Sequence, residues 1–188
     1  MELHIINREM ARLVEIPSDC RILEKNGEVR TVFIESGTNP LIDDFARLEK
    51  MLVPMEEILD DNVYVHQIKL NVKHGNGGDV WQWHQDFVYW KIEDGMQRPH
   101  AINAAIYLDD VTEFNGPVYV VPGSQHYNAA SETNNILEGD DAAFDNYQTS
   151  KAYMSTLTAK LKYTITPEAL TEMTTRNGLV SSKGPAGS

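Results

Sequence analysis

The chain of 188 residues has little cysteine and few basic side chains. Its single cysteine, Cys20, cannot form a disulfide within the chain, and a zinc site built from several cysteines is excluded. Only 16 Lys and Arg stand against 28 Asp and Glu, which gives a net charge of -12. This balance disfavours nucleic acid and anionic membranes as partners, because both attract clustered basic side chains.

Long apolar runs are also missing. No stretch reaches the roughly 20 apolar residues that a helix needs to cross a bilayer. The first residues, 1–9, lack the basic and then apolar pattern of a secretory signal, so we expect a cytoplasmic protein. The length suits one domain with a hydrophobic core, and we expect a single domain over residues 1–188. The acidity is explained by solubility, and the sequence is compatible with a homo-oligomer.

Residues 80–90 combine polar and aromatic side chains more densely than any other part of the chain. As an extended strand, this stretch would place His84 and Asp86 on the same face, because strand side chains alternate. A neutral imidazole and a carboxylate suit a non-haem iron(II) ion, which binds two His and one carboxylate. Three Trp, one Tyr and one Phe in the stretch would exclude water and leave a slot for a small organic molecule.

An isolated His-x-Asp pair is a weak signal, and a solvated strand end is the alternative interpretation. The surroundings favour the metal site. Alternation places Trp81 and Trp83 on one face, and Gln82 on the other face together with His84 and Asp86. The polar residues are therefore gathered rather than scattered.

A second polar set precedes this stretch. Residues 62–73 alternate and predict a long strand. On its polar face, Gln67 and Lys69 offer an amide and an ammonium, and an ammonium could hold a carboxylate of a dicarboxylate cosubstrate. A surface strand would show the same alternation and stays open as an alternative. His66 lies on the apolar face, where we expect a core histidine.

A further strand is predicted over residues 101–108. Its large apolar side chains share one face. Asn103 lies on the other face between Ala101 and Ala105, which leaves space for a ligand beside one amide.

Periodicity and turn residues predict the remaining elements. In the first part of the chain they are a helix over residues 3–14, a hairpin of residues 21–24 and 28–34 about Asn26-Gly27, and a helix from Asn39-Pro40 that Pro54 interrupts before residues 55–59. Later elements are a strand at 118–121 ended by a reversal at 122–126, a long loop over 127–157 and a strand at 161–165. A last helix begins at Thr166-Pro167-Glu168 and ends near Asn177-Gly178, and the tail 181–188 contains a turn.

Three segments carry a resemblance to a known family. They are Trp-His-Gln-Asp-Phe at 83–87, Trp90 with 93–96, and 115–117 through 122–124. In this order they resemble the phytanoyl-CoA dioxygenase family of iron(II)/2-oxoglutarate oxygenases, and especially its ectoine and amino-acid hydroxylase members. The resemblance runs from about residue 21 to the last residue. It implies a mainly β fold with flanking helices on a double-stranded β-helix (a cupin-like jelly roll), incomplete at the C-terminus.

The resemblance also implies roles for the polar residues. His84 and Asp86 would bind iron(II). Lys69, Asn103 and Trp81 would contact 2-oxoglutarate. Gln67 and Trp90 would face the 2-oxoglutarate or the prime substrate. Trp81 would need a local bulge for this role, because strict alternation puts it opposite His84.

At its ends the chain departs from the family. The family carries a second His ligand and an Arg for the far carboxylate of 2-oxoglutarate after a turn like that at 184–188. The chain also starts late and lacks the family's usual N-terminal segment. We therefore expect it to be truncated at both ends relative to the family, with both residues beyond Ser188; a third ligand from elsewhere is the alternative. His100 and His126 do not occupy the family's ligand position.

The expected activity is hydroxylation of a C–H bond in a small polar metabolite, a free amino acid or an ectoine-like derivative, with iron(II), 2-oxoglutarate and dioxygen. Related halogenases carry a small residue in place of the carboxylate, so Asp86 favours hydroxylation. One alternative is a non-catalytic barrel that binds a small molecule and has lost its complete metal site. Another is a zinc hydrolase using His84 and Asp86, although such enzymes usually have more His ligands.

Overall fold

The computed structural model describes residues 2–24, 26–75, 80–127, 136–138, 161 and 163–188. The chain forms two compact units. The first unit comprises Met1–Gly78, His100–Val111 and Gly184–Ser188, and the second comprises Asp79–Pro99 and Thr112–Lys183. None of the described helices has the length and the apolar character needed to cross a membrane.

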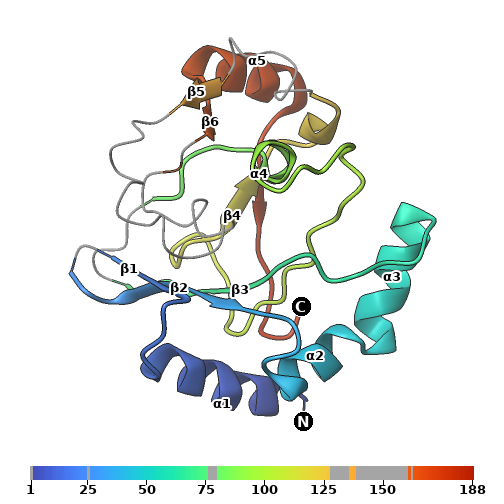
Figure 1. Ribbon diagram of the computed structural model, residues 1–188. Helices are drawn as coiled ribbons and strands as arrows, with labels where there is room; N and C mark the ends of the chain where they lie inside the picture. The colour runs from blue at the N-terminus through green and yellow to red at the C-terminus, as the bar shows by residue number, and fades with distance from the viewer. Residues whose placement is uncertain (1, 25, 76–79, 128–135, 139–160, 162) are drawn as a thin grey trace. The chain divides into compact units, whose positions relative to one another are not determined.

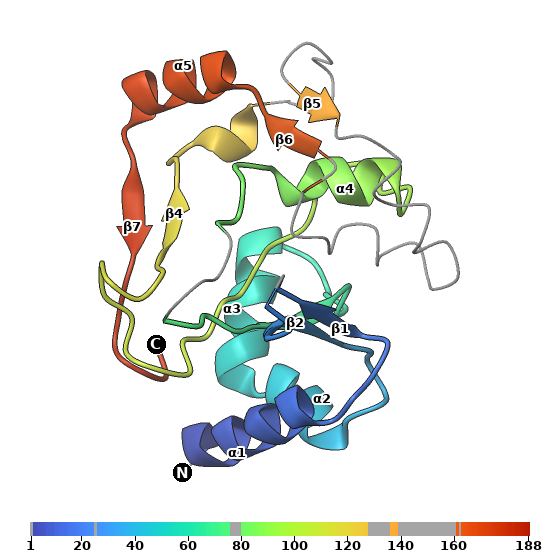
Figure 2. The ribbon, with the colours of Figure 1, turned by 90° about the vertical axis from the view of Figure 1, so that its left-hand side faces the viewer.

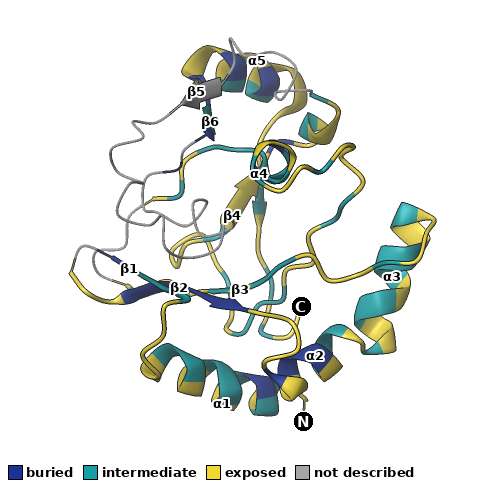
Figure 3. Ribbon diagram, in the orientation of Figure 1, coloured by how far each residue is buried: buried dark blue, intermediate teal, exposed yellow. Residues whose placement is uncertain are grey.

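The first unit is a three-stranded antiparallel sheet with helices (Figure 1). Its strands are β1 (Arg21–Leu23), β2 (Val29–Ile34) and β3 (Ile68–Asn71), with β2 in the centre. Its helices are α1 (Glu2–Glu15), α2 (Pro40–Ala46) and α3 (Glu49–Leu59). Every residue of β2 is buried, as the dark blue strand in Figure 3 shows.

The apolar face of α1 packs against one face of this sheet. The buried centre of the contact is Ile6 from α1, Ile34 from β2 and Ile42 from α2. Ile68 of β3 packs against the same cluster. This arrangement follows from the helical spacing of the apolar residues in α1, which gives the helix one apolar stripe.

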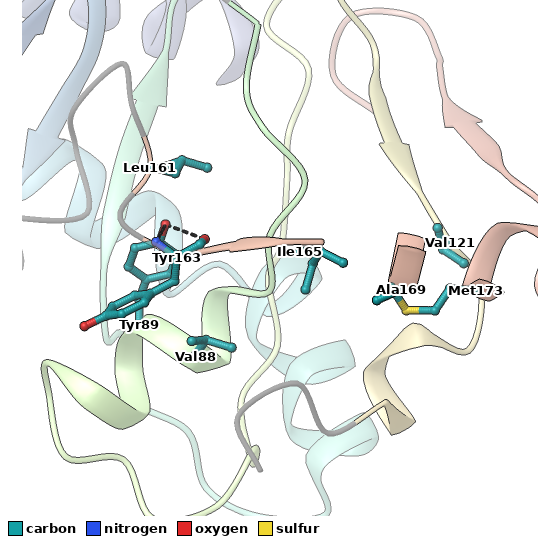
Figure 4. Close-up of a cluster of buried hydrophobic side chains, with 8 residues drawn as sticks. All are labelled: Val88, Tyr89, Val121, Leu161, Tyr163, Ile165, Ala169 and Met173. Carbon is teal, nitrogen blue, oxygen red and sulfur yellow. Dashed lines mark hydrogen bonds between the residues drawn. The ribbon is translucent and has the colours of Figure 1, made fainter. Parts of the chain in front are cut away.

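The second unit carries the remaining elements. They are α4 (Asp86–Ile92), β4 (Val118–Val120), the 3-10 helix η1 (Ser124–His126), β5 (Ile136–Glu138), β6 (Tyr163–Ile165), α5 (Pro167–Asn177) and β7 (Val180–Ser182). Strand β4 pairs with β7 and β5 pairs with β6, both antiparallel (Figure 2). The core joins α4, β6 and α5 and is shown in Figure 4; it consists of Val88, Tyr89, Val121, Leu161, Tyr163, Ile165, Ala169 and Met173.

Three local predictions are confirmed. The first helix spans Glu2–Glu15, and the predicted hairpin forms about Gly27, whose φ of 87° suits glycine. The amide of Gly27 donates to the carbonyl of Glu24 at 2.9 Å. Thr166 caps α5, because its hydroxyl accepts from the amide of Ala169 at 3.2 Å.

The predicted strand at 80–90 is wrong. Residues 80–85 are irregular backbone, and α4 begins at Asp86. The aromatic and β-branched residues of this stretch favour a strand by propensity. Helix α4 nevertheless buries Val88 and Tyr89 in the core, and tertiary packing overrides that propensity.

Two other predicted strands also differ. Of residues 62–73, only β3 (Ile68–Asn71) forms a strand, in antiparallel register with β2. His66 is exposed, so the expected core histidine is wrong. Residues 101–108 form no strand; the amide of Tyr107 instead donates to the carbonyl of Ser188 at 2.9 Å.

The remaining corrections concern element boundaries. The second helix breaks at Leu48, whose ψ of 136° leaves the helical region, and Pro54 lies inside α3. The tail contains β7 (Val180–Ser182) before its turn. Of the predicted loop at 127–157, residues 128–135 and 139–160 lie outside the described residues, and β5 lies between them.

Candidate metal centre in the second unit

His84 and Asp86 are brought together although they do not share a strand. The Nε2 atom of His84 lies 3.3 Å from the Oδ1 atom of Asp86. His84 belongs to the irregular stretch, whereas Asp86 is the first residue of α4, where the helix dipole favours a carboxylate. Their side chains are 25% and 26% exposed, so a metal ion from solvent can reach both.

A backbone hydrogen bond determines the tautomer of His84. Its Nδ1 atom lies 2.6 Å from the carbonyl oxygen of Gln82, and a carbonyl oxygen can only accept. Nδ1 therefore carries a proton. In the neutral ring Nε2 then presents a lone pair towards the Asp86 carboxylate, and two acceptors at 3.3 Å repel each other unless a proton or a cation lies between them.

The separation of the two atoms fits ligation of one divalent ion. Imidazole nitrogen and carboxylate oxygen bind such ions at about 2.1 Å, so adjacent ligands at angles of about 90–110° lie roughly 3.0–3.4 Å apart. The observed 3.3 Å lies in this range. Donation of the other ring N–H to a carbonyl is also typical of metal-binding histidines. The donor set of imidazole and carboxylate suits iron(II).

Hydrogen bonds from β6 and from Leu161 position the stretch that carries His84. The amide of Leu161 donates to Oε1 of Gln82 at 3.2 Å. The amide of Ile165 donates to the carbonyl of Trp83 at 2.8 Å. The backbone on the N-terminal side of His84 is therefore fixed without belonging to a regular sheet.

The residue between the two candidate ligands anchors the other side. The side-chain amide of Gln85 donates to the carbonyls of Ser124 at 2.8 Å and Tyr127 at 2.9 Å. Both acceptors belong to the turn around η1. Gln85 therefore uses its side chain for a tertiary contact, and it makes no side-chain cap of α4.

Tyr89 belongs to the core of this unit and contacts the ring of His84. Its ring meets the imidazole edge to face, with centroids 6.1 Å apart. Its hydroxyl donates to the carbonyl of Tyr163 at 2.8 Å and accepts from the amide of the same residue at 2.9 Å (Figure 4). Burial raises the pKa of the Tyr89 phenol well above its usual range, so the group stays protonated.

The aromatic residues of the stretch are part of the core of this unit. Trp81 and Trp83 both pack against the hydrophobic cluster. A hollow of about 110 Å³ lies beside His84, and Trp83, Tyr119 and Met173 contribute to its lining. Trp90 is half-buried in the last turn of α4. The predicted contacts of Trp81 and Trp90 with cosubstrate or substrate stay predictions.

The other predicted site residues, Gln67, Lys69 and Asn103, belong to the first unit. Lys69 pairs with Phe33 across β2 and β3 and is exposed, while its neighbours Ile68 and Leu70 are half-buried. The Lys69 side chain is therefore accessible to a ligand. Asn103 is exposed, and Gln67 is half-buried.

Sequence reasoning missed the residues that hold the candidate ligands. The two side-chain hydrogen bonds of Gln85 and the two hydrogen bonds of the Tyr89 hydroxyl join residues that are 39 to 74 positions apart in the sequence. The hydroxyl group of Tyr89 was the one feature of the sequence that could have indicated such a contact. A tyrosine hydroxyl buried in the core usually has a hydrogen-bond partner.

In the described part of the chain, no third His, Cys, Asp or Glu joins His84 and Asp86. Within it, no group of three or more His, Cys, Asp or Glu could hold a metal ion. His100 and His126 are both exposed.

Comparison with known proteins identifies the family. The chain matches the model of the phytanoyl-CoA dioxygenase (PhyH) family over residues 2–178, and it belongs to that family. It is 40% identical over 141 residues to L-proline trans-4-hydroxylase of Streptomyces griseoviridis, covering 75% of this chain and 49% of that protein. It is 31% identical over 194 aligned positions to ectoine dioxygenase of Streptomyces anulatus, covering 100% of this chain and 60% of that protein.

Solved structures support the same family. The chain is similar to EctD from S. alaskensis with 2-oxoglutarate and 5-hydroxyectoine, with a TM-score of 0.74 and 26% identity over 99% of this chain and 57% of that one. A structure of EctD with bound Fe gives a TM-score of 0.72, again over 99% of this chain and 57% of that one. The chain spans about half the length of the curated relatives it matches.

Proposed function

We propose that the protein is an iron(II)- and 2-oxoglutarate-dependent dioxygenase that hydroxylates a C–H bond of a small polar metabolite. The observation that carries this proposal is the 3.3 Å approach of His84 Nε2 to Asp86 Oδ1, with the Nδ1 proton of His84 committed to the carbonyl of Gln82. Membership of the family supports the same activity.

In this proposal His84 and Asp86 provide two of the three protein ligands of the metal. The hydrogen bond to Gln82 keeps the Nε2 lone pair available, and Asp86 lies in the first turn of α4, where a helix accommodates a carboxylate. Bound there, iron(II) would supply the redox chemistry with dioxygen that side chains lack. Because Asp86 provides a carboxylate, the proposed reaction is hydroxylation rather than halogenation.

We assign cosubstrate binding to Lys69, with Gln67, Asn103 and Trp81 as further contacts. An ammonium pairs well with one carboxylate of 2-oxoglutarate. The exposed position of Lys69, between two half-buried neighbours, leaves its charge free to meet such a ligand.

The proposed substrate is a free amino acid or an ectoine-like derivative, with Gln67 and Trp90 as its contacts. Two relatives support this class of substrate, because their names specify proline and ectoine. Trp83, which lines the hollow beside His84, would help to keep water from the reacting carbon.

Succinate release measured with a panel of amino acids and cyclic derivatives tests the proposal. We expect one class of substrate to stimulate succinate formation and to gain one oxygen atom. Asp86→Ala should lose this activity, whereas Asp44→Ala, at an 81% exposed side chain, should retain it. Retained activity in Asp86→Ala would contradict the ligand role. Substrate binding without succinate, with equal affinity in Asp86→Ala, would instead indicate a non-catalytic barrel.

A further inference from the structure

Tyr89 contacts both the candidate metal ligand His84 and strand β6. Only 3% of the surface of Tyr89 is exposed to solvent. Its ring meets the imidazole of His84 with an interplanar angle of 87°, and it meets the ring of Tyr163 with centroids 5.1 Å apart and an angle of 66°. Both arrangements are the edge-to-face geometry that aromatic rings prefer.

The hydroxyl of Tyr89 is fixed twice on the same residue of β6. It accepts from the Tyr163 amide at 2.9 Å and donates to the Tyr163 carbonyl at 2.8 Å (Figure 4). Moving the ring away from His84 would break both bonds and leave a buried amide and carbonyl without them. At the other end of α4, the hydroxyl of Tyr163 donates to Oε1 of Glu93 at 2.9 Å.

The imidazole of His84 needs a second restraint. Its Nδ1–H bond to the carbonyl of Gln82 restrains rotation about the Cβ–Cγ bond at one atom of the ring, but this single bond does not by itself fix the plane of the ring. Direction matters for a metal ligand, because the Nε2 lone pair must point at the ion. The Tyr89 ring meets the imidazole edge to face, with centroids 6.1 Å apart, and is placed to limit this rotation.

We propose that Tyr89 is a positioning residue for His84: its hydroxyl locks onto the backbone of Tyr163, and its ring then holds the plane of the imidazole. The inference rests on the proposed role of His84 as a metal ligand. Phenylalanine would fill the same volume in the core, so the hydroxyl is the part of Tyr89 that this role requires.

Titration of the protein with Co(II) tests the inference through the metal affinity and the visible absorption of the bound ion. We expect Tyr89→Phe to weaken Co(II) binding about tenfold, the lower end of the range for groups that orient a metal ligand, and to change the absorption spectrum. Tyr163→Phe is the matched control. It removes one buried hydroxyl and the bond to Glu93 but retains the backbone groups that hold Tyr89, so both readouts should stay unchanged.

Wild-type affinity and spectrum in a folded Tyr89→Phe protein would overturn the inference. If that variant does not fold, nuclear Overhauser contacts in the unaltered, metal-free protein decide: contacts between the Tyr89 ring and the His84 imidazole support the inference, and their absence overturns it. His84→Ala separates the two proposals. Undiminished Co(II) binding in His84→Ala would contradict the metal site itself, whereas loss in His84→Ala with none in Tyr89→Phe would contradict only the role of Tyr89.

Discussion

Arg30 and Glu24 form an ion pair inside the first unit, with Nη1 of the guanidinium 2.7 Å from Oε1 of the carboxylate. The two side chains are 1% and 5% exposed. Arg30 lies in the central strand β2, and Glu24 follows the end of β1. The pair therefore joins the hairpin by a charged contact that water does not reach.

We expect Glu24→Ala to lower the free energy of unfolding by about 3–5 kcal/mol, because it leaves a guanidinium buried without its carboxylate. Urea unfolding measures the change. The exposed pair of Arg176 and Glu172 on α5 is the control: Glu172→Ala should cost no more than about 0.5 kcal/mol. Equal effects of the two substitutions would contradict the importance of burial.

Glu9 should make the stability depend on pH. Hydrogen bonds from Arg12 and then Asn39 lower the pKa of its carboxyl from 4.5 to about 2. A lowered folded pKa adds stability that is complete above the unfolded pKa and is lost as pH falls through the folded one. The difference in unfolding free energy between wild type and Glu9→Gln should therefore be constant above about pH 5 and shrink towards pH 2.

The control for this prediction is Arg12→Met, which removes the largest cause of the shift. The pH dependence that Glu9 contributes should become smaller in this background. A difference that stays constant from pH 5 to pH 2 would show that Glu9 is not the titrating group.

Thr166 should contribute a cap to α5. Its hydroxyl accepts from the amide of Ala169, and Thr166→Ala should cost about 1–2 kcal/mol in urea unfolding. Thr166→Ser keeps the accepting oxygen and should recover most of that loss. If the serine variant were as unstable as the alanine variant, the packing of the Thr methyl group would explain the effect instead.

Gln85 should stabilise the second unit through its two amide bonds. In Gln85→Glu a carboxylate would face the carbonyls of Ser124 and Tyr127, so acceptors would meet acceptors. We expect this variant to lose about 1–3 kcal/mol, and more than Gln85→Met, which has no acceptor there. Thermal unfolding at neutral pH compares the stabilities of the two variants. A Gln85→Glu protein more stable than Gln85→Met would contradict the assigned contacts.

The sequence predicted those parts of the fold that depend on neighbouring residues. The turn at Asn26-Gly27 and the Thr166 cap are set by a positive φ and by a hydroxyl within three residues of its partner. Boundaries that depend on distant partners were not predictable. Residues 62–73 alternate throughout, but the strand is only as long as its pairing with β2 at Ile68–Asn71.

The proximity of His84 and Asp86 was predicted correctly, but from the wrong local structure. A strand would bring them together through alternation, whereas the protein uses an extended residue followed by the start of α4. The bonds that select this conformation come from Leu161 and Tyr163, 79 and 74 residues away from their partners. No local pattern encodes these contacts.

The most direct test of the central claim is the visible charge-transfer absorption that iron(II) gives when 2-oxoglutarate chelates it, recorded without oxygen. We predict this absorption in the wild-type protein and its loss in both His84→Ala and Asp86→Ala. It should persist in His100→Ala and His126→Ala, whose imidazoles are exposed. Absorption that survives in His84→Ala, or that disappears equally in all four variants, would contradict a metal centre formed by His84 and Asp86.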